Sequence, residues 1–518
     1  MSLIVSVAFA GHFTTAQQSL TTQETRGKQV YLHGTSPSGK DILAYVGDSS
    51  LEVPGNVMAC ANCHGIAGQG KVEGGINPSN VTWEALTKPY GITHVNGRKH
   101  PPYTSRGLEL AITRGVDPGG NKLLYAMPRY QMSKEDLDDL LVYLKRLGTD
   151  VDPGISENKI VIGMAFPSVG PIGELSQASR DVIAAAFAET NAQGGVYGRQ
   201  LELKSVSAAE TKLTRADVEK LIKDEKVFAL TGVMIAGVEN EIVTLLAEQE
   251  VPLIGPLTLD PKIGSPLNRQ VFYVLSGTST QARALISFMV KKPESQTMTI
   301  AVVHTGGDLA ASTLDAIKDQ SEREKLAAPQ IISYSAGSFS AAEMVKNLRQ
   351  ANTTAVFFMG SAADLLALMK EAASVSWFPQ IFVQSGTAGP TLFDAPAGFE
   401  GKVFCTFPTA PVDQTEDAIK EFRMLGEKYK LPQKHLAAQV SAYSSAKILI
   451  EGLKRVGKDL SRERLVQALE GFYNYPTGLT PPITYGPNRR IGASGAYIVM
   501  VDLKEKKFVP VSGWVEVN

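Results

Sequence analysis

Short apolar runs alternate with helical patterns along residues 158–518. Each run has the length and composition of a buried strand, and the stretches between them carry apolar side chains at helical spacing. The predicted strands are residues 159–165, 201–206, 227–231 and 251–255 in a first series and 298–304, 331–334, 355–360 and 380–384 in a second. This alternation predicts an α/β fold with parallel sheets in two Rossmann-like lobes, which close on a ligand by a hinge.

The first 150 residues have a different pattern. Residues 25–150 combine glycine-rich loops with short helical stretches and end in a strong helical repeat of leucines behind Ser133, a predicted N-cap. The pattern predicts a mainly α-helical domain. We expect a leader at residues 1–24, this domain at 25–150, a polar, turn-forming linker at 151–157 and the two-lobed domain at 158–518.

The composition is that of an ordinary soluble protein. The chain has 518 residues, too many for one hydrophobic core, and is 43% hydrophobic and 20% charged. Its net charge of -1 gives no reason to expect a nucleic acid or an anionic membrane as partner. No apolar stretch reaches the roughly 18–20 residues that span a bilayer. Residues 3–10 are apolar and end in a small-x-small site, which resembles a secretory signal peptide without its basic region; an incidental apolar start is the alternative.

One motif, Cys60-Ala61-Asn62-Cys63-His64, combines two cysteines with a histidine. This is the C-x-x-C-H spacing of c-type haem attachment, in which two thiols add to the haem vinyl groups and the histidine ligates the iron. A chance match, a redox C-x-x-C pair and half of a zinc site are the alternatives. Zinc would need two more ligands nearby, and the third cysteine, Cys405, lies alone in an apolar run. We therefore expect one covalent haem c, held by Cys60 and Cys63 and ligated by His64.

A downstream methionine offers the second axial ligand. Met127 lies on a loop before the terminal helix, and the fixed φ of Pro128 helps to hold that loop extended. Met132 is the rival ligand, and core packing is the alternative reading of a lone methionine. Thioether ligation raises the iron potential and suits single-electron transfer.

Residues 25–150 resemble a class I cytochrome c domain. The resemblance rests on residues 27–31 (GKQVY), the C-x-x-C-H motif, residues 127–130 (MPRY) and the closing helix at 136–147. It implies a helix near the N-terminus that crosses the closing helix, with the haem between them and with His64 and Met127 on the iron. The long loop 54–104 holds residues that could meet the haem propionates, but such residues are mostly exposed, and we expect them to be solvated. They are Arg98, Lys99, Tyr103 and, just past the loop, Arg106.

Residues 158–518 resemble the type I periplasmic binding proteins, in the branched-chain amino acid (Leu/Ile/Val) subfamily. Among the matching segments are residues 191–198 (NAQGGVYG), 251–256 (VPLIGP), 400–403 (EGKV) and 442–446 (AYSSA). The resemblance implies a periplasmic receptor that delivers a small solute to an ABC transporter permease or presents it to a sensor. It places the first lobe at about residues 158–275 and 403–475 and the second at about 276–402 and 476–518.

The ligand of such a fold should lie in the cleft between the lobes, where strands end. Our candidates at these ends are Pro167, Ser168, Ala236, Thr258, Ser276, Thr278 and Asp308. The alternative is that the hydroxyls among them only cap helices and turns. The family commonly has a serine and a threonine that hold the amino acid backbone. Here Ala236 stands at the first place and Thr258 is one residue from the second, which disfavours an ordinary α-amino acid as ligand.

Catalytic signatures are missing from the sequence. It holds no G-x-S-x-G, H-E-x-x-H or P-loop motif, and we expect an electron carrier and binding protein rather than an enzyme. We favour a periplasmic solute-binding protein that binds a small organic ligand and passes single electrons to or from a periplasmic redox partner such as a dehydrogenase. Two alternatives stay open. One is an electron-transfer cytochrome whose large domain is a docking or regulatory module, and the other is a haem-based redox or gas sensor.

Overall fold

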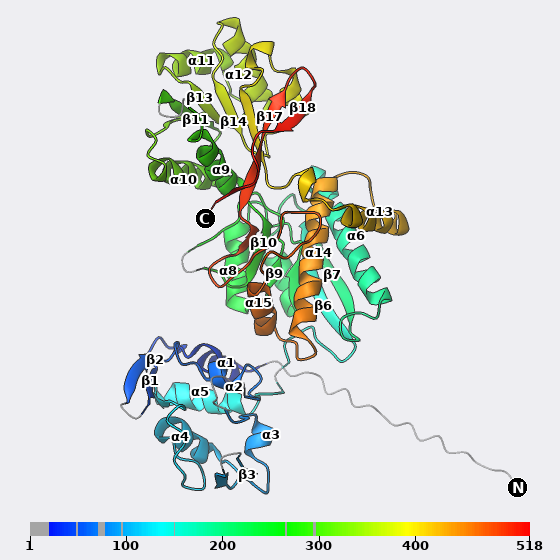
Figure 1. Cartoon of the computed structure of the whole chain (residues 1–518). Coiled ribbons are helices and arrows are strands. Elements are labelled where there is room, and N and C mark those ends of the chain that lie inside the picture. Colours follow the sequence, from blue (N-terminus) through cyan, green and yellow to red (C-terminus); the bar gives the residue numbers. More distant parts are fainter. Residues whose placement is uncertain are drawn as a thin grey trace, which may run out of the picture. The chain divides into compact units, whose positions relative to one another are not determined.

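The chain forms two compact units in a computed structural model, Met1–Pro153 and Gly154–Asn518 (Figure 1). The structure describes residues 20–47, 50–70, 78–94, 97–149, 151–264, 267–293 and 297–517. Most of the expected leader, residues 1–19, lies outside the described residues. Its expected end at residue 24 falls within helix α1 (Thr22–His33), which begins earlier because Thr21 and Glu24 form a capping box. Within the described ranges, no helix is long and apolar enough to cross a membrane.

Two helices that cross closely organise the first unit. α1 and α5 (Lys134–Leu144) approach so near at Gly27 that a Cβ there would overlap the Asp139 carbonyl oxygen. Arg26 pairs with the Asp139 carboxylate beside the crossing, Nε to Oδ2 2.6 Å. The expected crossing of an N-terminal and a closing helix is therefore present.

The other elements of this unit surround one apolar core. They are β1 (Leu43–Val46), β2 (Leu51–Pro54), α2 (Cys60–His64), α3 (Trp83–Leu86), β3 (Ile92–Thr93), β4 (Lys99–His100), α4 (Ser105–Arg114) and β5 (Arg129–Gln131). A small antiparallel sheet has the order β2-β1-β5, and β3 pairs with β4. Buried side chains of α1, α4 and α5 form the core.

The first lobe of the second unit is a parallel sheet with helices on both faces. Its strand order is β16-β10-β9-β8-β6-β7. The strands are β6 (Lys159–Pro167), β7 (Gln200–Ala208), β8 (Ala229–Thr231), β9 (Leu253–Ile254), β10 (Val271–Leu275) and β16 (Ile491–Ala493). One apolar cluster joins the sheet to α6 (Gly170–Ala192), α13 (Glu416–Tyr429), α14 (Leu436–Val456) and α15 (Arg462–Glu470). A second cluster joins it to α7 (Arg215–Lys223) and α8 (Glu239–Gln249).

The second lobe repeats this plan with an antiparallel extension. Its strand order is β12-β11-β13-β14-β15-β17-β18, and β19 also pairs with β17. The strands are β11 (Ile300–His304), β12 (Gln330–Ser333), β13 (Ala355–Met359), β14 (Gln380–Val383), β15 (Val403–Phe407), β17 (Gly495–Asp502), β18 (Lys507–Pro510) and β19 (Val515–Glu516). Helices α9 (Thr278–Met289) and α10 (Asp308–Arg323) pack with one apolar cluster, and α11 (Ala341–Gln350) and α12 (Ala362–Ser374) with the other. The predicted fold of two α/β lobes is confirmed.

The chain passes between the lobes three times, and two passages differ from the expected division. The resemblance assigns residues 403–475 to the first lobe, but β15 lies in the second sheet, parallel to β14 and antiparallel to β17. It assigns residues 476–518 to the second lobe, but β16 pairs with β10 of the first sheet. An apolar run shows that a strand is buried, but it does not tell which sheet the strand joins.

Hydrogen bonds connect the three passages. Ser276, which follows β10, donates from Oγ to the Gly495 carbonyl oxygen at 2.6 Å. Tyr497 of β17 donates to Asp413 Oδ1 at 2.5 Å, and Asp413 belongs to the segment between β15 and α13. The first passage is thus bonded to the third, and the third to the second, so that the hinge is one connected structure.

Candidate functional site

The C-x-x-C-H motif forms the short helix α2. Its spacing places Cys60, Cys63 and His64 on one helix face, because positions three and four apart are neighbours on a helix. His64 is buried, and its Nδ1 lies 2.9 Å from the Ser79 carbonyl oxygen. Donation from Nδ1 leaves Nε2 with the lone pair that a metal ion needs. Burial lowers the pKa of His64, which favours the neutral imidazole.

Two buried tyrosines hold the motif in place. Tyr31 of α1 donates to the Gly65 carbonyl oxygen at 2.7 Å, and Tyr130 of β5 donates to the Met58 carbonyl oxygen at 2.5 Å. The segment around the motif is therefore fixed from the first helix and from the strand that follows Met127.

The residues around the motif fit a haem. Cys60 and Cys63 are free thiols, and burial raises the pKa of Cys60 to about 12. Two thiols and an imidazole lone pair are the donors that covalent attachment and axial ligation require. Met127 and Met132 pack half-buried on the apolar core that Cys60 also contacts. The structure thus brings both candidate methionines to this core.

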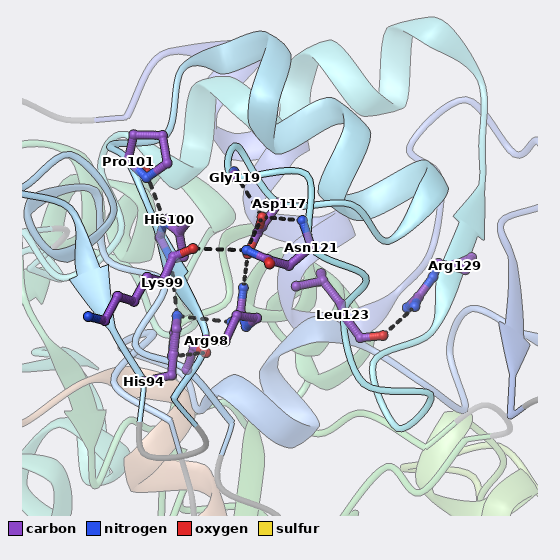
Figure 2. A network of polar contacts seen from close by, with 11 residues as sticks. His94, Arg98, Lys99, His100, Pro101, Asp117, Gly119, Asn121, Leu123 and Arg129 are labelled. Atoms are coloured by element: carbon purple, nitrogen blue, oxygen red, sulfur yellow. Dashed lines mark hydrogen bonds and ion pairs between the residues drawn. The ribbon is translucent and has the colours of Figure 1, made fainter.

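A polar network joins the loop before α4 to the loop after it (Figure 2). Arg98 pairs with buried Asp117, Nη1 to Oδ2 2.6 Å, and its Nη2 lies 2.9 Å from His94 Nε2. Its side chain is only 15% exposed. The expectation that Arg98 is solvated is therefore wrong, because the loops fold over it and supply its partners. Tyr103 is buried as well, whereas Lys99 and Arg106 are exposed.

Asp117 is the acceptor at the centre of this network. Burial alone would raise the pKa of Asp117, but hydrogen bonds from Asn121, Arg98 and the Gly119 N–H outweigh it and lower the pKa. Asn121 also donates to the Lys99 carbonyl oxygen at 2.8 Å. The loop that leads towards Met127 is thus tied to the strand β4.

The second lobe has a cavity of about 250 Å³ at the carboxyl ends of its strands. Thr305 follows β11, Met359 ends β13 and Gln384 follows β14. The remaining lining residues are Leu259, Thr278, Gly306, Leu309, Ala310, Thr313, Gly360, Gly386 and Thr387. Leu259 belongs to the loop after β9, so the first lobe also borders the cavity. This is the edge at which open α/β sheets bind ligands.

Only some of the cleft candidates lie at this cavity. Thr278 lines it, and its hydroxyl is 3.1 Å from that of Thr313. Asp308 is exposed and begins α10, directly before the lining residue Leu309. Pro167 is buried at the end of β6, and Ala236 is half-buried against the first lobe's core.

The hydroxyls of the other candidates bond within the protein. Ser168 donates to the Ala208 carbonyl oxygen at 2.7 Å, and Thr258 donates to Glu239 Oε1 at 2.7 Å. Ser276 is the hinge residue described above. All three hydroxyls have partners within the protein, and none of the three residues lines this cavity.

Sequence reasoning missed Thr305 and Gln384 in the cavity wall. Thr305 comes directly after the predicted strand 298–304, and Gln384 ends the predicted strand 380–384. A search of the polar residue at every predicted strand end would have found both.

Comparison with known proteins gives the class of each unit. The family model for periplasmic binding proteins matches residues 159–507, and that for cytochrome c matches residues 56–148. The chain therefore belongs to the periplasmic binding protein family and carries a cytochrome c domain ahead of its binding domain. Both resemblances seen in the sequence are confirmed. A cytochrome c domain implies covalently bound haem c.

Relatives and solved structures match the binding domain at low identity. The leucine-, isoleucine-, valine-, threonine- and alanine-binding protein of Pseudomonas aeruginosa is 20% identical over 326 residues, which are 62% of this chain and 86% of that protein. A branched-chain amino acid ABC transporter from Thermus thermophilus with bound valine has a TM-score of 0.54 at 18% identity and covers 70% of this chain and 98% of that chain. The fatty acid ABC transporter substrate-binding protein from Thermomonospora curvata has a TM-score of 0.55 at 19% identity and covers 71% of this chain and 95% of that chain. At these identities, the solved structures establish the fold alone.

Proposed function

We propose that this chain is a periplasmic receptor that binds a small organic solute between its lobes and transfers single electrons through one haem c. The observation that carries the proposal is the helix α2 with its buried, carbonyl-bonded His64, in a chain that belongs to the periplasmic binding protein family. In this proposal, Cys60 and Cys63 would attach the haem, and His64 and Met127 would ligate its iron. A bound haem supplies one-electron chemistry, and two protein ligands on the iron favour electron transfer over reaction with oxygen.

The polar contacts in the first lobe support a solute other than a simple α-amino acid. Ala236 has no hydroxyl, and the Thr258 hydroxyl donates to Glu239 and accepts from the Asp260 N–H at 2.9 Å. The side chains that line the cavity in the second lobe are uncharged, with Thr305 and Gln384 among them. We therefore propose an organic solute that uncharged polar groups of the second lobe recognise.

The partners follow from the two domains. The named relatives are an amino-acid-binding protein and components of ABC transporters. By likeness to them, the binding domain would hand its solute to an ABC transporter permease. The haem would exchange electrons with a periplasmic redox protein, such as a dehydrogenase.

Native mass spectrometry on protein from a host that matures c-type haem tests the proposal. One haem plus one co-purified small molecule would support it and give the mass of the solute. Thermal unfolding with leucine, valine, threonine, alanine and a medium-chain fatty acid then tests the solute class. A ligand at 100 times its Kd raises the free energy of unfolding by about 2.7 kcal/mol. A haem-loaded protein with no co-purified solute and no thermal response would favour the docking-module alternative.

A further inference from the structure

One side chain, that of Arg129, holds the loop that carries Met127. Arg129 Nη2 donates to the Leu123 carbonyl oxygen at 2.9 Å, and Nη1 donates to the Met127 carbonyl oxygen. Figure 2 shows Arg129 reaching back to Leu123. Both acceptors precede Arg129 in the sequence, so its guanidinium folds back on its own loop and bridges two points of it.

Gly115 provides the space for this guanidinium. A Cβ at Gly115 would overlap Arg129 Nε, so the side chain lies directly on the Gly115 main chain. The φ of Gly115 is +64°, which also favours glycine, and its carbonyl accepts from the Leu123 N–H at 2.8 Å. Gly115, Leu123, Met127 and Arg129 form one packed group, which we call the Arg129 clamp.

The clamp starts from a fixed strand. Arg129 is the first residue of β5 and lies opposite Tyr45 in the antiparallel sheet. The next residue, Tyr130, is bonded to the Met58 carbonyl oxygen, two residues before Cys60. The Met127 main chain is thus held at a set place relative to the haem-attachment segment.

We propose that Arg129 is the positioning residue that keeps Met127 on the haem iron. This rests on the proposed function, in which Met127 is the axial ligand. A planar guanidinium binds two carbonyl oxygens at once, whereas a lysine ammonium is a point donor on a flexible stem. Because the loop is fixed beforehand, ligation of the iron loses less conformational entropy. The fixed positive charge also favours the reduced haem over the oxidised one.

The test uses the full haem-loaded chain with Arg129→Lys, Arg129→Gln and a control, Arg106→Gln. Arg106 lies in the same unit, with a side chain 67% exposed. We would measure the charge-transfer absorbance of methionine-ligated ferric haem, the rate at which carbon monoxide binds the ferrous haem, and the reduction potential. Both Arg129 variants should lose most of the absorbance and bind carbon monoxide at least tenfold faster. Their potentials should fall, and further for Gln than for Lys, which keeps the charge. Arg106→Gln should change none of these.

Unchanged absorbance, carbon monoxide rate and potential in both Arg129 variants would overturn the proposal. Met127→Leu separates this failure from failure of the ligand assignment: if it keeps the absorbance, Met127 is not the ligand and the proposed function itself is at fault. Gly115→Ala covers the case in which the Arg129 variants do not fold. The added Cβ would displace the guanidinium without removing it, so carbon monoxide binding should also become faster. An unchanged rate would contradict the proposal.

Discussion

The C-x-x-C-H segment and the cavity of the second lobe are built in opposite ways. Cys60, Cys63 and His64 lie within five consecutive residues, and the geometry of one helical turn alone sets them on a common face. The cavity takes Thr278, Thr305 and Gln384 from separate strand and helix ends, which only the folded sheet brings together. Local helix geometry sets the donor residues of a contiguous site on one face, whereas an assembled site depends on the packing of the whole lobe.

The largest effect should come from breaking the contiguous site. With Cys60→Ser and Cys63→Ser combined, neither thioether can form, and we expect complete loss of covalent haem by denaturing mass spectrometry. The solute response in thermal unfolding should persist, because the cavity residues lie in the other unit. Cys405→Ala is the control: this cysteine is buried in the second lobe's core and should leave the haem attached. Covalent haem on the double variant would refute the attachment site.

The first lobe, which borders the cavity through Leu259, should be sensitive to a buried change far from the cavity. Arg490 is 2% exposed, and its Nη2 lies 2.6 Å from Glu470 Oε1. Its Cζ lies over the Phe272 ring, 4.6 Å from the ring centroid. Arg490→Met leaves the Glu470 carboxylate without its nearest cation and should lower the free energy of unfolding by about 3 kcal/mol. The measurement is urea unfolding followed by far-ultraviolet circular dichroism.

Its neighbour provides a matched control. Arg489 pairs with Glu516 at the surface, with side chains 34% and 52% exposed, and Arg489→Met should cost less than about 1 kcal/mol. In both variants, the unfolding transition followed by haem absorbance should be the same as in the unaltered protein, because the haem unit is the other compact unit. If Arg490→Met costs no more than Arg489→Met, the buried pair does not support the lobe.

The same contrast explains what the sequence could predict. Local signals were enough for the C-x-x-C-H motif, for α5 behind Ser133 and for the strand–helix alternation of both lobes. They could not assign β15 and β16 to their sheets, because periodicity encodes burial and not the pairing partner. Long-range contacts were equally hidden, such as Ser276 with Gly495 across the hinge.

The haem unit also contains an assembled contact, because the buried carboxylate of Asp117 joins two of its loops. Its folded-state pKa is lowered, so it contributes stability above its unfolded pKa of about 3.9, and this is lost as pH falls through the folded value. Asp117→Asn should cost about 2 kcal/mol at pH 7, and the cost should shrink in acid. Urea unfolding followed by haem absorbance at pH 7 and at about pH 3 measures this. Asp138→Asn, at an exposed ion pair with Lys134, is the control and should cost less than about 1 kcal/mol at pH 7. An equal cost at both pH values would contradict the role of the Asp117 charge.

The smallest expected effect tests which of the two lobes recognises the ligand. Thr305 lines the cavity, whereas the Thr258 hydroxyl is directed to Glu239. Thr305→Val keeps the side-chain shape and removes one hydrogen-bonding group, which should cost about 1 kcal/mol, or roughly fivefold in Kd, for the solute found by mass spectrometry. Thr258→Val should destabilise the fold slightly and leave the Kd unchanged. Isothermal titration calorimetry on the two variants gives the answer. A larger loss of affinity for Thr258→Val would return ligand recognition to the first lobe and, with it, restore an α-amino acid as the solute.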